Sequence, residues 1–176
     1  HPTIEVPGIE VNTGALGHGL SIGVGMALAA KMNHQSYKTY VLMGDGEQGE
    51  GSIYEAAMAA NQYKLDNLVA IIDRNRLQIS GTTEEVMAIE DIYQRWTALG
   101  WDVKHMNGDD IEDIVHCFSE IDFESKRPHL LISHTTKGKG VSYMENVTKW
   151  HHGVPNQEEF DLAIKEISER IATLEK

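Results

Sequence analysis

Short apolar runs alternate along this chain with longer stretches whose apolar residues recur every three or four positions. The runs are typical of buried β-strands, and the stretches are typical of amphipathic helices. We predict strands at residues 40–43, 68–72, 101–106 and 129–134. We predict helices at residues 16–32, 53–63, 89–99, 110–118 and 156–176. Because strands alternate with helices, the expected fold is α/β, a doubly wound and mostly parallel sheet flanked by helices, in a single domain spanning 1–176.

The first predicted helix is unusually rich in glycine. Gly19, Gly23 and Gly25 fall inside it, and Gly17 lies near its start. A glycine in a helix interior costs about 1 kcal/mol relative to alanine. The density of glycines therefore predicts a helix whose backbone packs tightly against a sheet, a partner or a ligand.

Two of the later helices have recognisable starts. Asp109 is the predicted N-cap of helix 110–118, and Asn156 with Glu159 is similar to a capping box at the start of the last helix. The apolar residues of that last helix form one stripe, made of Phe160, Ala163, Ile164, Ile167, Ile171 and Leu174.

Charge and cysteine content exclude several classes of protein. A net charge of −12 over 176 residues argues against nucleic acid as a main partner, and no apolar run is long enough to span a membrane. The single cysteine, Cys117, excludes a disulfide framework, fits a reducing cytoplasm and is expected to be a packed thiol. The chain opens on His1 rather than Met, so we expect a piece of a longer polypeptide.

Metal-ligating side chains follow two of the predicted strands. Asp45 lies between Gly44 and Gly46 directly after the first strand, and Asn75 follows the second. In an open parallel sheet, ligands bind outside the carboxyl ends of the strands. Glycine lets the backbone approach a phosphate, and carboxylate and amide oxygens suit Mg²⁺ or Ca²⁺. The pattern predicts a metal–diphosphate site with Asp45, the Asn75 amide and the backbone carbonyl of Leu77 on the ion.

Other charged residues have two readings each. Lys137 and Lys139 lie beside glycines, either in a solvated loop or in contact with a phosphate or a partner chain. Three acids, Glu47, Glu50 and Glu55, follow the glycine turn. Either their negative charge stabilises the N-terminus of the next helix, or they have a more specific role.

Taken together, the motifs resemble transketolase. The chain is most similar to the N-terminal, diphosphate-binding subunit of the split bacterial type, within the thiamine-diphosphate enzyme superfamily. The resemblance rests on Gly-Asp-Gly at 44–46 followed by Asn75, and on the segments 1–17, 73–81 and 137–153. These segments cover nearly the whole chain.

The resemblance implies a role for each candidate residue around the metal. Asp45, Asn75 and the Leu77 carbonyl would bind Mg²⁺ or Ca²⁺. The Gly46 amide and His152 would meet the diphosphate of thiamine diphosphate, and His152 would also assist proton transfer as a catalytic residue.

Further roles are implied away from the metal. Gly14 and Leu16 would line the cofactor, and His1 would contact the hydroxyls of the donor sugar as a second catalytic residue. Glu50 and Glu55 match acids at the subunit interface of the family.

The implied activity is transfer of a two-carbon ketol (glycolaldehyde) unit from a ketose phosphate to an aldose phosphate. The family's first segment is missing from this sequence, and so is its pyrimidine-binding domain. Activity is therefore expected only with a partner subunit that carries this domain, in a dimer or heterotetramer in the cytoplasm. Deoxyxylulose-phosphate synthase, the α subunit of 2-oxoacid dehydrogenases and a non-catalytic assembly subunit of the same fold are the alternatives.

Overall fold

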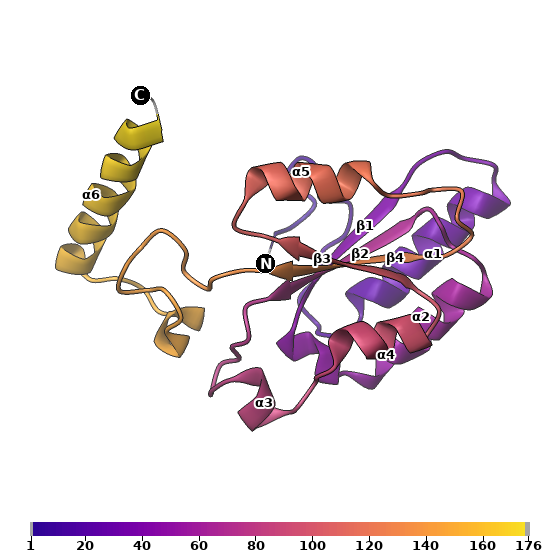
Figure 1. Cartoon of the computed structure of the whole chain (residues 1–176), viewed down its shortest axis with the longest axis horizontal. Coiled ribbons are helices and arrows are strands. Elements are labelled where there is room, and N and C mark those ends of the chain that lie inside the picture. Colours follow the sequence, from indigo (N-terminus) through magenta and orange to yellow (C-terminus); the bar gives the residue numbers. More distant parts are fainter. Residues whose placement is uncertain (1, 175–176) are drawn as a thin grey trace.

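Four parallel strands form one sheet in the order β1-β2-β4-β3 (Figure 1). The structure is a computed structural model, and it describes residues 2–174. The strands are β1 (Thr39–Gly44), β2 (Leu68–Arg74), β3 (Asp102–Asn107) and β4 (His129–His134). All four strand predictions are confirmed, with boundaries that differ by no more than a few residues.

The helices agree with the predicted pattern less closely at their ends. They are α1 (Gly19–Met32), α2 (Gly51–Gln62), α3 (Thr83–Val86), α4 (Ile92–Ala98), α5 (Ile111–Ser119) and α6 (Gln157–Leu174). Two 3₁₀ turns are also present, η1 (Gly46–Gly49) and η2 (Thr148–His151). The short helix α3 was not predicted, and α1 begins at Gly19 rather than at residue 16.

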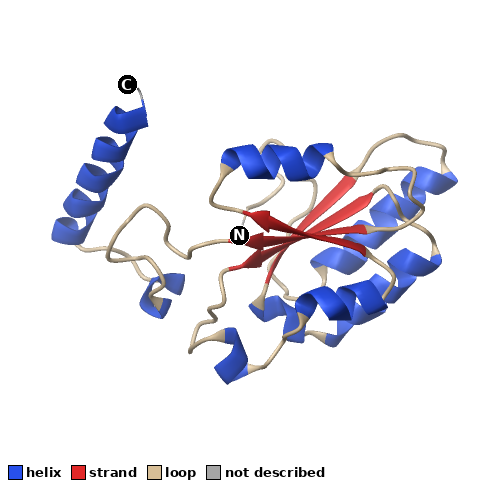
Figure 2. Ribbon diagram, viewed as in Figure 1, coloured by secondary structure: helices blue, strands red, loops and turns tan. Residues whose placement is uncertain are grey.

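Helices cover the sheet on both faces, as the doubly wound prediction requires. Helices α1, α2 and α4 lie on one face and α5 on the other (Figures 1 and 2). Strand β2 shows why its run is apolar without interruption: Leu68, Ala70 and Ile72 enter the larger core, whereas Val69 enters the smaller core beside Cys117. Burial raises the pKa of the Cys117 thiol, which confirms a packed cysteine.

The glycine-rich helix α1 packs closely on β1, as its composition predicts, but only at some of its glycines. A Cβ atom at Gly23 would overlap Cγ2 of Val41, so no side chain fits there without a shift of its neighbours. Gly25 faces outward, and a Cβ atom there would meet nothing within 4 Å. Close packing on the sheet therefore explains Gly23 and does not explain Gly25.

Replacing Gly23 with alanine should lower the free energy of unfolding by about 1–3 kcal/mol, because Val41 is a stiff β-branched residue that cannot easily move away. Gly25→Ala is the matched control in the same helix. It should raise stability by about 0.5–1 kcal/mol, because alanine is the better helix former. Urea denaturation of both variants measures the difference, and equal effects would contradict the packing argument.

Of the two predicted helix starts, the one at α6 is confirmed and the one at α5 is wrong by one residue. The N-cap of α5 is Asp110, whose carboxylate accepts a hydrogen bond from the Glu112 amide, and not Asp109. Asp109 instead accepts from the Thr136 amide, because its carboxylate turns toward the loop after β4. At α6 the capping box is confirmed, with Asn156 and Glu159 each accepting a hydrogen bond from the other's amide.

Helix α6 lies apart from the sheet at the end of a long loop (Figure 1). It is fixed to that loop by Glu166, which accepts hydrogen bonds from the Ser142 amide and hydroxyl. Most of its apolar stripe stays exposed, and Ala163 is the buried residue of the helix. Within residues 2–174, no helix is both long and apolar enough to cross a bilayer.

Candidate functional site

The two predicted metal ligands lie side by side at the carboxyl ends of β1 and β2. These strands pair directly, with Gly44 opposite Asp73, and the Asp45 amide donates to the Asp73 carbonyl at 3.2 Å. Asp45 and Asn75 both line a cavity of about 420 Å³. The cavity walls also include Gly46, Leu77, Lys137 and His151. The structure therefore brings the predicted ligands to one site.

Asp45 is almost fully buried, and its two carboxylate oxygens have different surroundings. Oδ2 accepts from Nη1 of Arg74 at 3.0 Å and from the Arg76 amide at 2.6 Å. Among residues 2–174, the single donor to Oδ1 is the Gly46 amide, at 2.8 Å. A carboxylate oxygen has two lone pairs, so Oδ1 keeps one free for a ligand.

The loop after β2 brings Asn75 and Leu77 to the same cavity. The side chain of Asn75 turns toward the following residues, so that its Oδ1 accepts from the Leu77 amide at 3.0 Å. The chain then turns tightly, with the Gln78 amide donating to the Gly81 carbonyl. One carboxylate, one amide oxygen and one peptide carbonyl form a donor set that fits Mg²⁺ or Ca²⁺. Within residues 2–174, no cluster of three or more His, Cys, Asp or Glu side chains could hold a metal, and this donor set does not depend on one.

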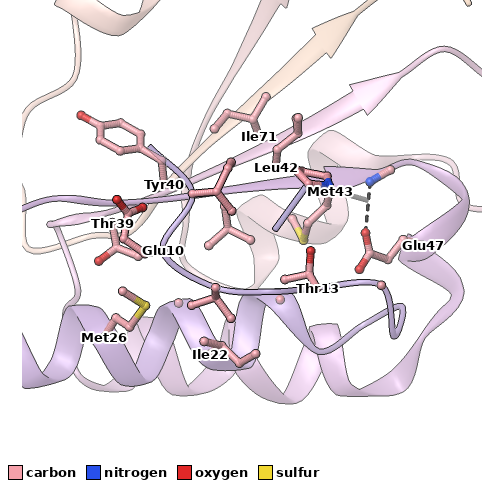
Figure 3. A pocket seen from close by; sticks show the side chains of 18 of the residues that line it. Glu10, Thr13, Ile22, Met26, Thr39, Tyr40, Leu42, Met43, Glu47 and Ile71 are labelled. Carbon is pink, nitrogen blue, oxygen red and sulfur yellow. Dashed lines mark hydrogen bonds between the residues drawn. The ribbon is translucent and has the colours of Figure 1, made fainter. Parts of the chain in front are cut away.

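A second and larger cavity, of about 1060 Å³, lies between the N-terminal segment, α1 and β1 (Figure 3). Figure 3 shows Ile22 and Met26 on one side of it, with Tyr40 and Leu42 on the other. Gly14 and Leu16 line this cavity, and Leu16 lines the smaller one as well. Asp45 and Asn75 do not line the larger cavity, so the two predicted ligand side chains belong to the smaller one.

Glu47 fixes the segment that carries Gly14 and Leu16. Its Oε1 accepts from the Gly17 amide at 2.8 Å. Its Oε2 accepts from the Gly44 amide at 3.1 Å, a hydrogen bond that Figure 3 draws as a dashed line. This carboxylate therefore ties the loop to the end of β1. The sequence left open whether this acid stabilises a helix N-terminus or has a more specific role, and it did not indicate this contact with the loop.

Comparison with known proteins agrees with this geometry. A sequence-family model described as "Transketolase, thiamine diphosphate binding domain" matches residues 1–169. The chain belongs to this transketolase family. The match supports thiamine diphosphate as the cofactor that the domain binds.

Relatives within the transketolase family include subunits of split proteins. The chain is 77% identical over 176 residues to an apulose-4-phosphate transketolase subunit of Phocaeicola vulgatus, and the match covers all of this chain and 63% of that protein. It is 47% identical to the protein of the same name from Actinobacillus succinogenes, with 94% of this chain and 59% of the relative covered. The chain thus spans about 60% of the length of these relatives.

The fold agrees with solved transketolases. The crystal structure of transketolase from Campylobacter jejuni superposes with a TM-score of 0.86 at 35% identity, covering 96% of this chain and 27% of that one. Transketolase from Leishmania mexicana gives a TM-score of 0.75 at 26% identity, covering 97% and 30%. The predicted thiamine-diphosphate-binding fold is confirmed.

Not every transketolase site residue lies where the resemblance places it. His152 is exposed and does not line the smaller cavity, whereas its neighbour His151 does. The two rings lie 6.1 Å apart, and burial, helped by Lys137 and His152, lowers the pKa of His151. The sequence offers adjacent histidines and no signal to choose between them. His1 lies outside the described residues.

The structure also places the Gly46 amide, the two predicted interface acids and Lys137 of this transketolase domain. The Gly46 amide, predicted to meet the diphosphate, donates to Asp45 Oδ1, so an incoming phosphate oxygen has to share or replace that acceptor. Glu50 and Glu55 are exposed and line neither cavity. Lys137 lies in the wall of the smaller cavity, which favours contact with a phosphate over a solvated loop.

Proposed function

We propose that this chain is the diphosphate-binding part of a split transketolase that transfers a two-carbon ketol (glycolaldehyde) unit from a ketose phosphate to an aldose phosphate. The observation that carries the proposal is the shared cavity of Asp45, Asn75 and Leu77 at the ends of two adjacent strands. Membership of the transketolase family supports it.

The chain's own residues hold the metal and the charged end of the cofactor. Asp45, Asn75 and the Leu77 carbonyl would hold Mg²⁺ or Ca²⁺, whose positive charge would offset the negative charge of the diphosphate. The Gly46 amide would meet the phosphate oxygens, and the positive charge of Lys137 in the cavity wall favours the same anion. The resemblance gives a second phosphate contact to His152, but in this structure its neighbour His151 lines the cavity. When bound, thiamine diphosphate supplies the electron sink for cleavage of the donor's carbon–carbon bond.

The remaining residues position the organic end of the cofactor and the sugar. Gly14 and Leu16 line the cofactor, and Glu47 holds their loop against β1. His1 contacts hydroxyls of the donor sugar. By the resemblance, His152 would also assist proton transfer as a general acid or base.

Catalysis requires a second subunit that carries the pyrimidine-binding domain, and the assembly is a dimer or heterotetramer in the cytoplasm. Glu50 and Glu55 lie at the interface, which agrees with their exposure on and beside α2. The relatives are named as subunits, which supports a partner chain. The word "apulose-4-phosphate" in their names supports sugar phosphates as substrates.

Incubation of the full-length protein and its partner subunit with thiamine diphosphate, Mg²⁺, a ketose phosphate and an aldose phosphate should yield sugar phosphates that differ from the substrates by two carbons. Chelation of the metal should stop the reaction, because the diphosphate is held through the ion. Mass spectrometry of the products measures the transfer.

Each alternative predicts another outcome in the same assay. Deoxyxylulose-phosphate synthase and 2-oxoacid dehydrogenases release CO₂ from a 2-oxoacid, so CO₂ release would contradict the proposal. A non-catalytic assembly subunit would bind no cofactor in a metal-dependent manner, even with the partner present. The intact set of Asp45, Asn75 and Leu77 argues against this last alternative.

A further inference from the structure

Arg74, the last residue of β2, is a charged side chain in an unexpected place. Only 2% of its side chain is exposed, and it lies directly beside Asp45. Removing a guanidinium group from water is costly unless its charge and its donors are satisfied. A buried arginine next to a metal-binding carboxylate therefore requires an explanation.

The guanidinium group joins the site to the chain that follows it. Nη1 donates to Asp45 Oδ2 at 3.0 Å and to the Thr83 hydroxyl at 2.8 Å. Nη2 donates to Glu90 Oε1 at 2.6 Å. Burial acts to lower the pKa of Arg74, but the hydrogen bonds to Glu90 and Asp45 outweigh it and hold that pKa above its usual value.

These contacts determine which oxygen of Asp45 faces the ligand. Arg74 and the Arg76 amide occupy Oδ2, so the carboxylate cannot rotate without breaking both hydrogen bonds. Oδ1 is then left with the free lone pair. Because Asn75 follows Arg74 directly in the chain, the same contacts also hold the second metal ligand relative to the first.

We propose that Arg74 is a positioning residue, which orients Asp45 for the metal and ties the loop of residues 75–90 to the site. The inference rests on the proposed function. A lysine cannot replace the arginine fully, because its single ammonium group cannot match the planar fork that reaches Asp45, Thr83 and Glu90 in different directions.

The test measures binding of Mn²⁺, as a probe for the divalent site, in the presence of thiamine diphosphate. Electron paramagnetic resonance counts the free ion in samples of the full-length protein in its natural assembly. Arg74→Ala should weaken Mn²⁺ binding by about 10- to 100-fold, the range for residues that orient a metal ligand. Arg74→Lys should give an intermediate loss, and added guanidinium ion should restore part of the affinity of Arg74→Ala.

Arg127→Ala is the matched control. Arg127 also fixes a loop, by donating to the Gly100 and Trp101 carbonyls, but at the opposite end of the sheet. Its loss should lower the melting temperature without changing the affinity for Mn²⁺. The control separates a positioning role from a purely structural one, because both arginines stabilise the fold and only Arg74 contacts Asp45.

Two results would overturn the inference, and they are distinguishable. If the wild-type protein binds Mn²⁺ with thiamine diphosphate and Arg74→Lys binds it equally well, Arg74 does not position Asp45 and the proposed function stands. If the wild-type protein binds no Mn²⁺ with thiamine diphosphate, the proposed function fails and the inference fails with it. Arg74→Lys keeps the charge, so the test holds even if Arg74→Ala does not fold.

Discussion

Replacing Asp45 with asparagine should abolish metal-dependent binding of thiamine diphosphate. The substitution keeps the shape of the side chain but removes the negative charge that a divalent ion requires. It also places an NH₂ group where one carboxylate oxygen stood. If the amide oxygen keeps the hydrogen bonds from Arg74 and Arg76, the NH₂ group takes the position of Oδ1, where it can neither bind a cation nor accept from the Gly46 amide. We expect a loss of affinity of at least about 100-fold, the upper end of the effect of outer-shell residues. Calorimetric titration of the full-length protein, with and without Mg²⁺, measures it.

Asp66→Asn controls for the loss of a buried carboxylate elsewhere. Asp66 is also buried and paired, with Nζ of Lys31 at 2.6 Å and the Lys126 amide at 3.2 Å, but it precedes β2 at the far end of the sheet. This variant should lose stability and keep its affinity for the cofactor. An Asp45→Asn protein that binds the cofactor with Mg²⁺ as tightly as the wild type would refute the ligand assignment.

Replacing Trp101 with alanine should cost about 3–5 kcal/mol of the free energy of unfolding, the largest stability effect that we expect. Trp101 is fully buried and meets the edge of Trp96 with ring centroids 4.7 Å apart. Its indole nitrogen also donates to the Ala57 carbonyl at 3.0 Å, which joins α2 to the start of β3. The alanine variant loses all these contacts and leaves a cavity. Denaturation of the full-length protein by urea measures the loss.

Trp150 offers the comparison for this second prediction. Its indole nitrogen also donates to a backbone carbonyl, that of Tyr143, but its ring is only partly buried and lies in the loop before α6. Trp150→Ala should therefore cost clearly less than Trp101→Ala. Equal losses of unfolding free energy in the two variants would contradict the prediction that the core between α2, α4 and β3 contributes more to stability than the loop before α6.

Strands were predicted more reliably than helix ends, for a physical reason. A strand buried on both faces must be apolar at every position, and β2 meets this condition from Leu68 to Ile72. Helix ends depend on single side chains that choose among neighbouring amides. Asp109 and Asp110 are equally good caps by type, and only the path of the backbone decides between them. Helix α3 did carry a sequence signal, the capping box of Thr82 and Glu85, from which it could have been predicted.

The site was predictable where the sheet determines it and unpredictable elsewhere. Asp45 and Asn75 follow adjacent strands, so their proximity follows from the topology alone. Nothing in the sequence indicates that Arg74 turns inward, because a charged residue at a strand end is usually exposed. The choice between His151 and His152 depends on the orientation of η2, which neither apolar pattern nor spacing specifies.

The all-parallel sheet has a consequence for the lifetime of the native state. Each strand pair joins segments separated by a helical crossover, so none of the pairs can form as a local hairpin. Strands β2 and β4 pair although the whole of β3 lies between them in the sequence. Such long-range pairing makes folding slow. Asp45 and Asn75 meet only once β1 and β2 are joined. A bound ion should therefore retard unfolding and leave the rate of folding unchanged.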